Sequence, residues 1–400
     1  MISNIFAPIV GLFLSWPIFI DLYNFEMINQ ESYWFEGVGI PMPVGALILV
    51  FLFVIFNFSN KKIVFIKNST KILITLIILT PLSLYFYLVS GLSVPRIIQL
   101  TMPIFLFLVV AYPEKMNVRR LLFFSWILGF FIFLTFHMIY VLWNSSEFNM
   151  IDEFSYTLIF EHRIYQALVS YPGVITIFYF LLLSISISKF RFPFKYTFCT
   201  IGGIFAIIHI GMAARRVGLF ELTFGILIFI SLLIINWGNI NYSSRKFAFI
   251  FLGILMPIHI LILLKSPLFL RSTESASEGE FDSGRLDIYR EAYMYFSSNI
   301  EGLLFGVGGG GHVGFHNYLL DTVHRVGVIG FFALFVVALL FSIRFLNFTT
   351  LKNRSMKIMA LAPIFICCLM QVTVNSAITQ PYYLIFLFMA FFAINFVIFE

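Results

Sequence analysis

Charged residues are scarce in this chain. Only 11% of its 400 residues are charged, whereas 60% are hydrophobic and the mean hydropathy is +0.98. Because a soluble globular domain carries about a quarter charged residues, the composition excludes a cytosolic enzyme, a secreted domain, a disordered chain and a nucleic-acid-binding module. It predicts a polytopic membrane protein, and the 53 Phe residues suit contact with lipid.

Cysteines are also few, and none lies in a polar loop. Cys199, Cys367 and Cys368 all fall inside apolar runs. This placement excludes a disulfide framework and a CxxC metal site. The N-terminus lacks both a basic segment and a small-residue cleavage site, so we interpret residues 5–23 as a retained span and not as a signal peptide.

The apolar runs have the length of membrane-spanning helices. About 20 residues are needed to cross the hydrocarbon region. Twelve runs qualify, at about 4–23, 43–58, 72–90, 97–112, 121–143, 171–188, 196–213, 217–237, 247–264, 326–343, 358–373 and 382–398. We therefore predict an all-α fold, a polytopic helical bundle of about 12 transmembrane helices that forms a single membrane domain over residues 1–400.

The distribution of basic residues predicts the orientation of this bundle. One set of alternate loops carries 16 Lys and Arg residues, and the other segments carry 9. The richer set comprises the loops at 59–71, 113–120, 189–195, 238–246 and 344–357. Because cytoplasmic loops are enriched in Lys and Arg, we predict that these loops and both termini are cytoplasmic.

Two predicted external loops are long enough to hold a site, 144–170 and 265–325. The second begins with an acidic, Ser-rich stretch and continues into a helical pattern. We predict an amphipathic helix there, started by Asp282 and Ser283. The expected apolar stripe is Leu286, Tyr289, Tyr293 and Phe296, and the expected polar face is Asp287, Arg290 and Glu291.

A glycine-rich segment, GVGGGGHVGFHN at 306–317, follows in the same loop. Such a backbone can wrap a phosphate group or act as a hinge. No GK[ST] follows, so it is not a P-loop. The segment places His316 just before the helix that enters the span near Val326, and His324 lies two turns further along, nearer the membrane.

Two arginines, Arg215 and Arg216, occur in GMAARRVGLFEL between two apolar runs with almost no loop. This position predicts the outer mouth of a helical hairpin. Charges near the membrane usually serve a site, although they can also extend toward lipid phosphates. Glu221 follows inside the next span, as a counter-ion of the arginines or as a functional carboxylate. Arg163 is a further external cation.

These segments resemble the superfamily of O-antigen polymerases and O-antigen ligases. The resemblance covers roughly residues 200–345. It rests on AARRVGLFEL at an outer helix end, on SGRLDIYREA at the start of the loop helix, and on LLFGVGGGGHVGFHNYLLDTVHRVGVIGFF, in which an LxGxG run leads to HN and a glycine-bearing span.

The resemblance implies a GT-C-like glycosyltransferase of the bacterial inner membrane. Such an enzyme transfers a glycan from an undecaprenyl-diphosphate carrier to an acceptor sugar hydroxyl on the outer, periplasmic face. The expected partners are undecaprenyl-diphosphate-linked oligosaccharides and membrane lipid; whether a polysaccharide chain-length regulator binds is left open. The family's hairpin Arg falls on Arg215 or Arg216, its loop Arg on Arg285 and its His on His316. The doubled Arg leaves open which of the two is functional.

A metal-independent, inverting displacement without a cofactor is the expected mechanism. Guanidinium groups recognise diphosphate through paired hydrogen bonds, and we assign Arg215, Arg216 and Arg285 to the leaving diphosphate. His316 suits a general base near neutral pH. The remaining candidates are Arg290, Arg163 and His324 as further diphosphate contacts, and Glu280 and Asp282 as alternative bases.

Three functions fit this pattern to different degrees. A polymerase uses a second lipid-linked repeat unit as acceptor, and we favour it. A ligase uses the lipid A–core sugar instead. A polysaccharide flippase is disfavoured, because the spans are almost uncharged except at Glu221 and because a flippase has no need of a 60-residue external loop.

Overall fold

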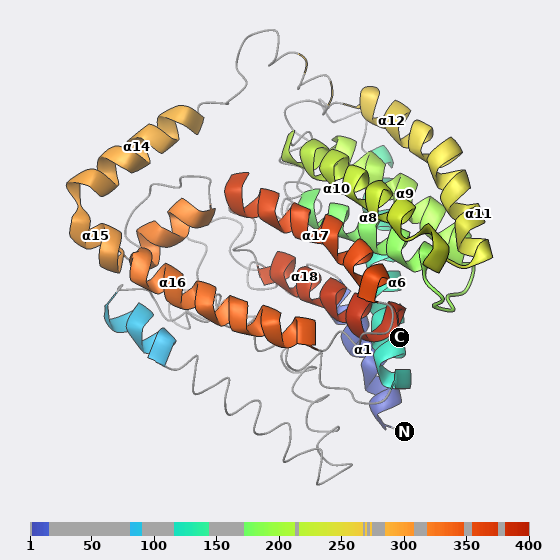
Figure 1. Cartoon of the computed structure of the whole chain (residues 1–400), viewed down its shortest axis with the longest axis horizontal. Coiled ribbons are helices and arrows are strands. Elements are labelled where there is room, and N and C mark those ends of the chain that lie inside the picture. The colour runs from blue at the N-terminus through green and yellow to red at the C-terminus, as the bar shows by residue number, and fades with distance from the viewer. Residues whose placement is uncertain are drawn as a thin grey trace.

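The structure is a computed structural model of the chain. It describes residues 2–15, 81–89, 116–143, 172–212, 216–266, 269, 273, 285–307, 318–347, 354–374 and 381–399. The regular elements among these residues are all helices (Figure 1), which confirms the predicted all-α class. The predicted spans 43–58 and 97–112 and the predicted external loop 144–170 lie outside the described residues.

The helices have the following bounds. Before residue 240 they are α1 (Ile2–Ser15), a short α-helix at 81–88, α6 (Met116–Trp143), α8 (Pro172–Ile187), α9 (Lys195–Met212), α10 (Arg216–Ile235) and the 3-10 turn η3 (Trp237–Asn239). They continue with α11 (Tyr242–Ile250), the π-helical η4 (Phe251–Leu255), α12 (Met256–Leu264), α14 (Arg285–Ser298), α15 (Ile300–Phe305), α16 (Tyr318–Asn347), α17 (Arg354–Val374), α18 (Pro381–Ala393) and the π-helical η6 (Ile394–Ile398).

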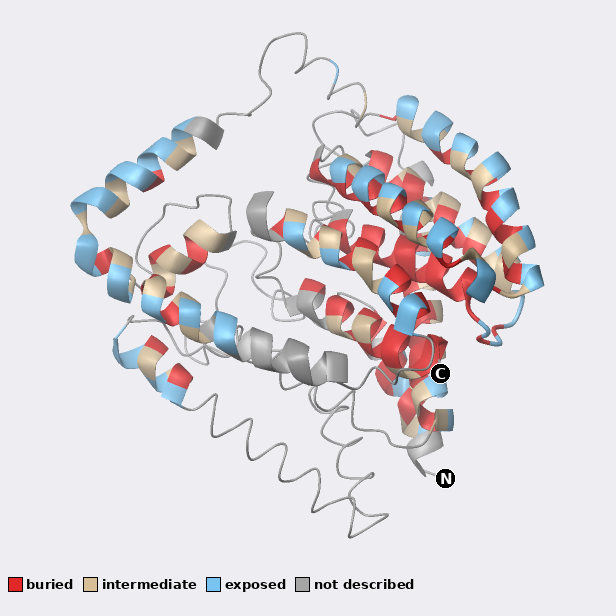
Figure 2. Cartoon of the chain, in the orientation of Figure 1, coloured by how far each residue is buried: buried red, intermediate tan, exposed pale blue. Residues whose placement is uncertain are grey.

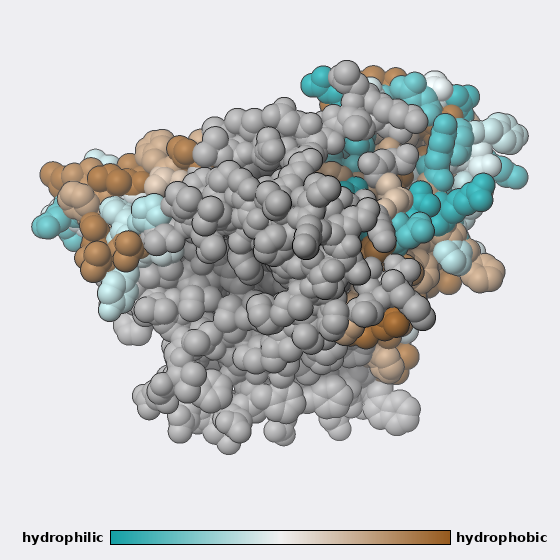
Figure 3. Space-filling view, turned by 90° about the horizontal axis from the view of Figure 1, so that it is seen from below, coloured by the Kyte–Doolittle hydropathy of each residue, from teal (hydrophilic) through white to brown (hydrophobic). Residues whose placement is uncertain are grey.

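Four helical stretches in the described part of the chain are long and apolar enough to cross a membrane. They are Met116–Phe136, Val217–Ile235, Tyr242–Leu264 and Arg354–Gln371. Each coincides with a predicted span. Their exposed residues are largely apolar, and hydrophobic side chains lie on the outer surface of the molecule (Figure 3). Large exposed apolar surfaces mark contact with a membrane or with another protein, and on helices long enough to cross a membrane they indicate a membrane-embedded protein.

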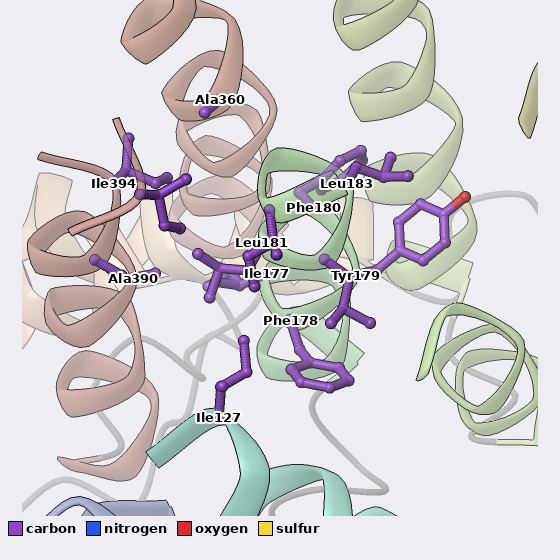
Figure 4. Close-up of a cluster of buried hydrophobic side chains, with 14 of the residues drawn as sticks. Ile127, Ile177, Phe178, Tyr179, Phe180, Leu181, Leu183, Ala360, Ala390 and Ile394 are labelled. Atoms are coloured by element: carbon purple, nitrogen blue, oxygen red, sulfur yellow. The ribbon is translucent and has the colours of Figure 1, made fainter. Parts of the chain in front are cut away.

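Helix α8 lies at the centre of the bundle. Every residue from Gly173 to Ser188 is buried (Figure 2), as expected for a helix that is apolar on all sides. Its neighbours include α9, α10, α17 and α18. Side chains such as Ile177 and Phe178 point into the core (Figure 4), where the ring of Phe130 lies 4.9 Å from Phe178 and 4.6 Å from Phe386. Each such ring pair contributes about 1 kcal/mol beyond simple burial.

Helices α1 and α6 pack closely through small residues. A side chain on Gly11 would overlap Ser125, and one on Gly129 would overlap Ser15. Small residues of this kind let membrane helices approach at backbone distance. Because contacts advance in the same direction along both helices, α1 and α6 run parallel. The sequence prediction has both of them crossing outward.

Basic side chains gather where helices end on the predicted cytoplasmic side. Lys195 donates to the carbonyl of Ser188 at 2.6 Å, and the buried Lys357 donates to that of Asn395 at 3.0 Å. The guanidinium of Arg119 lies 5.1 Å from the centre of the Phe396 ring. Ser188 lies just beyond the end of α8, and Asn395 lies in η6, the last turn of the helix that continues from α18. Both carbonyls are therefore near a helix C-terminus, which attracts positive charge.

The predicted amphipathic helix is present as α14, but its buried face differs from the prediction. Asp287, Arg290 and Glu291 are exposed, as predicted. Tyr293, which we placed on the apolar stripe, is 75% exposed, whereas Ala292 is buried. Tyr293 therefore does not pack on the other described helices. The sequence predicted that the stripe would lie on the bundle or on the membrane surface, and within the bundle α14 packs on α15 and on the start of α16.

Candidate functional site

The candidate site lies where several helix ends face α14 and α15. Figure 1 shows the N-terminal ends of α10 and α18 and the C-terminal end of α17 on one side of the bundle, toward α14 and α15. The first turn of α1 and the end of η6 lie on the other side. This is the side that the sequence predicts to be external.

A buried carboxylate lies just below these helix ends. Glu221, in the second turn of α10, is completely buried. The amide Nε2 of Gln371, on α17, donates to its Oε1 atom at 2.5 Å. The hydroxyl of Thr176, on α8, is a second hydrogen-bonding neighbour of this carboxylate. The Oε2 atom of Glu221 and the Oε1 atom of Gln371 are buried, and no atom in the described part of the chain forms a hydrogen bond with either of them.

Helix α18 completes this polar cluster with Tyr383, whose hydroxyl lies 3.9 Å from the sulfur of Cys368. Gly173 makes the close packing possible. A Cβ atom there would lie 2.8 Å from the Tyr383 ring and 2.9 Å from Nε2 of Gln371. Thus α8, α10, α17 and α18 converge on one group of polar side chains at the predicted outer end of the bundle.

The paired arginines stand at the start of α10. Arg216 is its first residue, and α9 ends at Met212. Arg215 and the side chain of Arg216 lie outside the described residues. Arg216 and Glu221 are five residues apart, which places them about 140° apart around the helix. The described hydrogen-bonding neighbours of Glu221 are Gln371 and Thr176, which the sequence did not predict.

The loop arginines lie on α14. Arg285 is its first residue, and the side chain of Arg285 lies outside the described residues. Arg290 pairs with Asp287 at 3.1 Å, and both side chains are more than 70% exposed. An exposed pair of this kind adds little stability. Arg163, Glu280, Asp282 and His316 lie outside the described residues.

His324 is buried between α16 and α14. Its ring centre lies 5.0 Å from that of Tyr295 and 6.4 Å from that of Phe296. Burial lowers the pKa of His324, Asp321 acts against this shift and Arg325 adds to it. The sequence suggested a diphosphate contact at His324, and the observed position favours a neutral ring that holds α14 against α16.

The glycine-rich segment begins with a tightly packed junction. Gly306 ends α15 and Gly327 interrupts α16, and both have positive φ, 85° and 72°. The amide of Val307 donates to the carbonyl of His324 at 2.9 Å. The Tyr85 hydroxyl donates to the carbonyl of Val326 at 3.3 Å. Gly306 is therefore a fixed contact point and not a hinge; residues 308–317 lie outside the described residues.

In the described part of the chain, no three His, Cys, Asp or Glu side chains are arranged to hold a metal ion. No protein-family model matches the chain, and a comparison with curated proteins finds no match.

Sequence reasoning missed Gln371, Thr176 and Tyr383. Each is an uncharged polar residue inside an apolar run, where a hydroxyl or an amide is common and gives no spacing signal. The one available clue was Glu221 itself. A carboxyl group inside a span requires polar neighbours, but only the packing of the helices identifies them.

Proposed function

We propose that this protein is a surface-polysaccharide polymerase of the O-antigen polymerase type. It transfers a glycan from undecaprenyl diphosphate to the sugar hydroxyl of a second lipid-linked repeat unit. In this proposal the chain has about 12 transmembrane helices in a GT-C-like arrangement and lies in the bacterial inner membrane. Both termini are cytoplasmic, and the active site is on the outer face.

One structural observation carries the proposal. Helix α10 begins at Arg216 and α14 begins at Arg285, and both N-termini lie on the same side of the bundle (Figure 1). The N-terminus of a helix attracts anions because its first amide groups are unpaired and its dipole is positive there. Two helix N-termini that each begin with an arginine form a suitable receptor for a diphosphate group at the membrane surface.

The proposed reaction is a direct displacement at the anomeric carbon of the donor sugar. The acceptor hydroxyl attacks this carbon, the bond to the diphosphate oxygen breaks, and His316 takes the hydroxyl proton. Negative charge grows on the departing undecaprenyl diphosphate. Arg215, Arg216 and Arg285 stabilise it, an effect worth about 3–4 kcal/mol for each well-placed donor in a site that excludes water. A single displacement inverts the configuration at this carbon.

The energy of the reaction comes from the donor, which carries its own leaving group. No nucleotide sugar is required on the outer side. The apolar outer surface of the bundle suits the polyprenyl chain of the donor, which stays in the membrane while its diphosphate reaches the arginines.

The decisive experiment uses the purified full-length protein in lipid nanodiscs. The donor is the carrier-linked repeat unit isolated from cells that lack this protein. We expect a ladder of carrier-linked oligomers together with released undecaprenyl diphosphate. Transfer to lipid A–core alone would instead identify a ligase. If folded protein gives neither product with its native repeat unit, the proposed glycosyl transfer is wrong.

A further inference from the structure

The pair formed by Glu221 and Gln371 has an unusual hydrogen-bond pattern. A carboxyl group and a primary amide face one another, and each has two polar atoms. The Gln371 Nε2 atom donates to the Glu221 Oε1 atom. The two remaining oxygens, Oε2 of Glu221 and Oε1 of Gln371, are both buried and have no hydrogen-bond partner among the described residues. Two buried acceptors in one pair are costly, because neither can donate to the other.

A single proton removes this conflict. A protonated carboxyl group has an O–H donor, and if Oε2 carries it, that group can donate to Oε1 of Gln371. The acid and the amide then form a ring closed by two hydrogen bonds, and both buried oxygens are satisfied. An ionised carboxylate would leave both of them unsatisfied and would add a buried charge.

The surroundings of Glu221 also favour the neutral form. Thr176 faces it from α8, Cys367 and Cys368 from α17, and Tyr383 from α18. None of these side chains carries a positive charge at any pH. On its own helix, Arg216 lies about 140° around the axis. Among the side chains that the structure describes, none with a positive charge faces Glu221, and a buried carboxylate in such surroundings is strongly disfavoured.

We propose that Glu221 is a proton-binding site and that its acid–amide ring with Gln371 is a protonation-dependent clamp between α10 and α17. When Glu221 loses the proton, the Oε2–H bond breaks, the proton passes to water, and the ring is left with one hydrogen bond and an unpaired charge. The clamp lies five residues from Arg216, so Glu221 is a positioning residue for the outer end of α10. The link to Arg216 rests on the proposed function, whereas the proton site does not.

Infrared spectroscopy of the full-length protein tests the proton directly. A protonated carboxyl group has a carbonyl stretch distinct from that of a carboxylate. We expect this band in the wild-type protein at neutral pH and its loss in Glu221→Gln. The matched control Glu291→Gln removes an exposed carboxyl group on α14 and should leave the band unchanged. Absence of the band from the wild-type protein at neutral pH would overturn the proposal.

Thermal unfolding gives a second measurement that needs no substrate. The Gln in Glu221→Gln has an amide N–H₂ in place of the proposed O–H, so it can keep both hydrogen bonds. We expect the melting temperature of the wild-type protein to fall by several degrees at alkaline pH, and that of Glu221→Gln to stay flat over the same range. Glu291→Gln should follow the wild type.

Two outcomes of this measurement count against the clamp. An equal alkaline fall in Glu221→Gln would show that another group titrates. Stabilisation of the wild type by sodium chloride, but not by choline chloride, would show that a cation and not a proton bridges the two oxygens. If the clamp holds while the purified protein shows no glycosyl transfer, only the proposed function fails.

Discussion

The backbone of Gly306, at the end of α15, lies directly against the backbone of Gly327 in α16. A side chain on Gly306 would overlap the carbonyl of Arg325, and one on Gly327 would overlap the carbonyl of Leu304. The φ and ψ angles are 85° and 166° at Gly306, and 72° and 171° at Gly327. Only glycine adopts this region without strain. The outer helices α14 and α15 are thus attached to α16 at a point that tolerates no side chain.

Gly327→Ala should therefore destabilise the protein. We expect a loss of at least about 2 kcal/mol, from backbone strain and from overlap with the carbonyl of Leu304. Denaturant unfolding in detergent measures the loss, and limited proteolysis should show earlier cleavage near α14. Gly238→Ala is the control, because a Cβ there meets nothing within 4 Å. Equal stability of the two variants would contradict a packed junction.

The arginines at the two helix starts should matter for donor binding. Arg216→Ala and Arg285→Ala should each lower the rate of polymerisation by about 100-fold, because each removes a guanidinium group that stabilises the charge on the leaving diphosphate. Arg191→Ala removes an exposed arginine on the predicted cytoplasmic side and should leave the rate near that of wild type. The assay is initial rate in nanodiscs at equal protein level. Full activity in Arg285→Lys would show that paired hydrogen bonds are not required there.

His316 is the assigned general base. His316→Ala should lower the rate by about 100-fold or more, whereas His312→Ala, in the same glycine-rich segment, should have a small effect. The rate as a function of pH is the measurement, because loss of the base should also remove the acidic limb of the profile. If Glu280→Gln or Asp282→Asn removes that limb instead, the base is a carboxylate.

Stability should fall in mildly acidic solution because of His324. Burial lowers its pKa in the folded protein, so below about pH 6.5 the unfolded chain binds more protons than the folded chain. The contribution of neutral His324 to the free energy of unfolding is complete above that pH. It is lost as the pH decreases toward the pKa of His324 in the folded protein. His324→Phe keeps an aromatic ring between Tyr295 and Phe296 and should flatten the acidic fall in melting temperature.

The exposed Tyr293 provides a control for this effect. Tyr293→Phe, on the same helix α14, should retain the pH dependence of the wild type. If His324→Phe keeps the full acidic fall, another group causes it and the ring of His324 is not the sensitive contact.

The predicted orientation can be tested by labelling cysteines in intact cells. Cys199 and Cys367 are buried and Cys368 is partly buried, so an impermeant maleimide should leave the native protein unlabelled. Tyr293→Cys, on the predicted outer side, should react at once. Arg191→Cys should react only after the membrane is permeabilised. Labelling in the opposite order would reverse the topology and exclude a periplasmic site.

The sequence predicted the helical class and the main helix boundaries well. Apolar runs of this length can satisfy their backbone groups in lipid only as helices, so 217–237 and 358–373 coincide with α10 and α17 to within a few residues at each end. The start of α14 near Arg285 was also predicted closely, because Asp282 and Ser283 favour a helix N-terminus. The sequence did not predict that Ala292, and not Tyr293, would be buried against the protein.

By itself, the sequence determined that this chain is a bundle of membrane helices. It also determined which charged residues lie near the ends of these helices, because both properties follow from hydropathy along the chain. The tertiary structure alone decided that Glu221 meets Gln371, that Gly306 meets Gly327 and that His324 lies against α14. These contacts join residues up to 150 positions apart. They depend on which helices become neighbours, and similar apolar surfaces along the chain do not specify that choice locally.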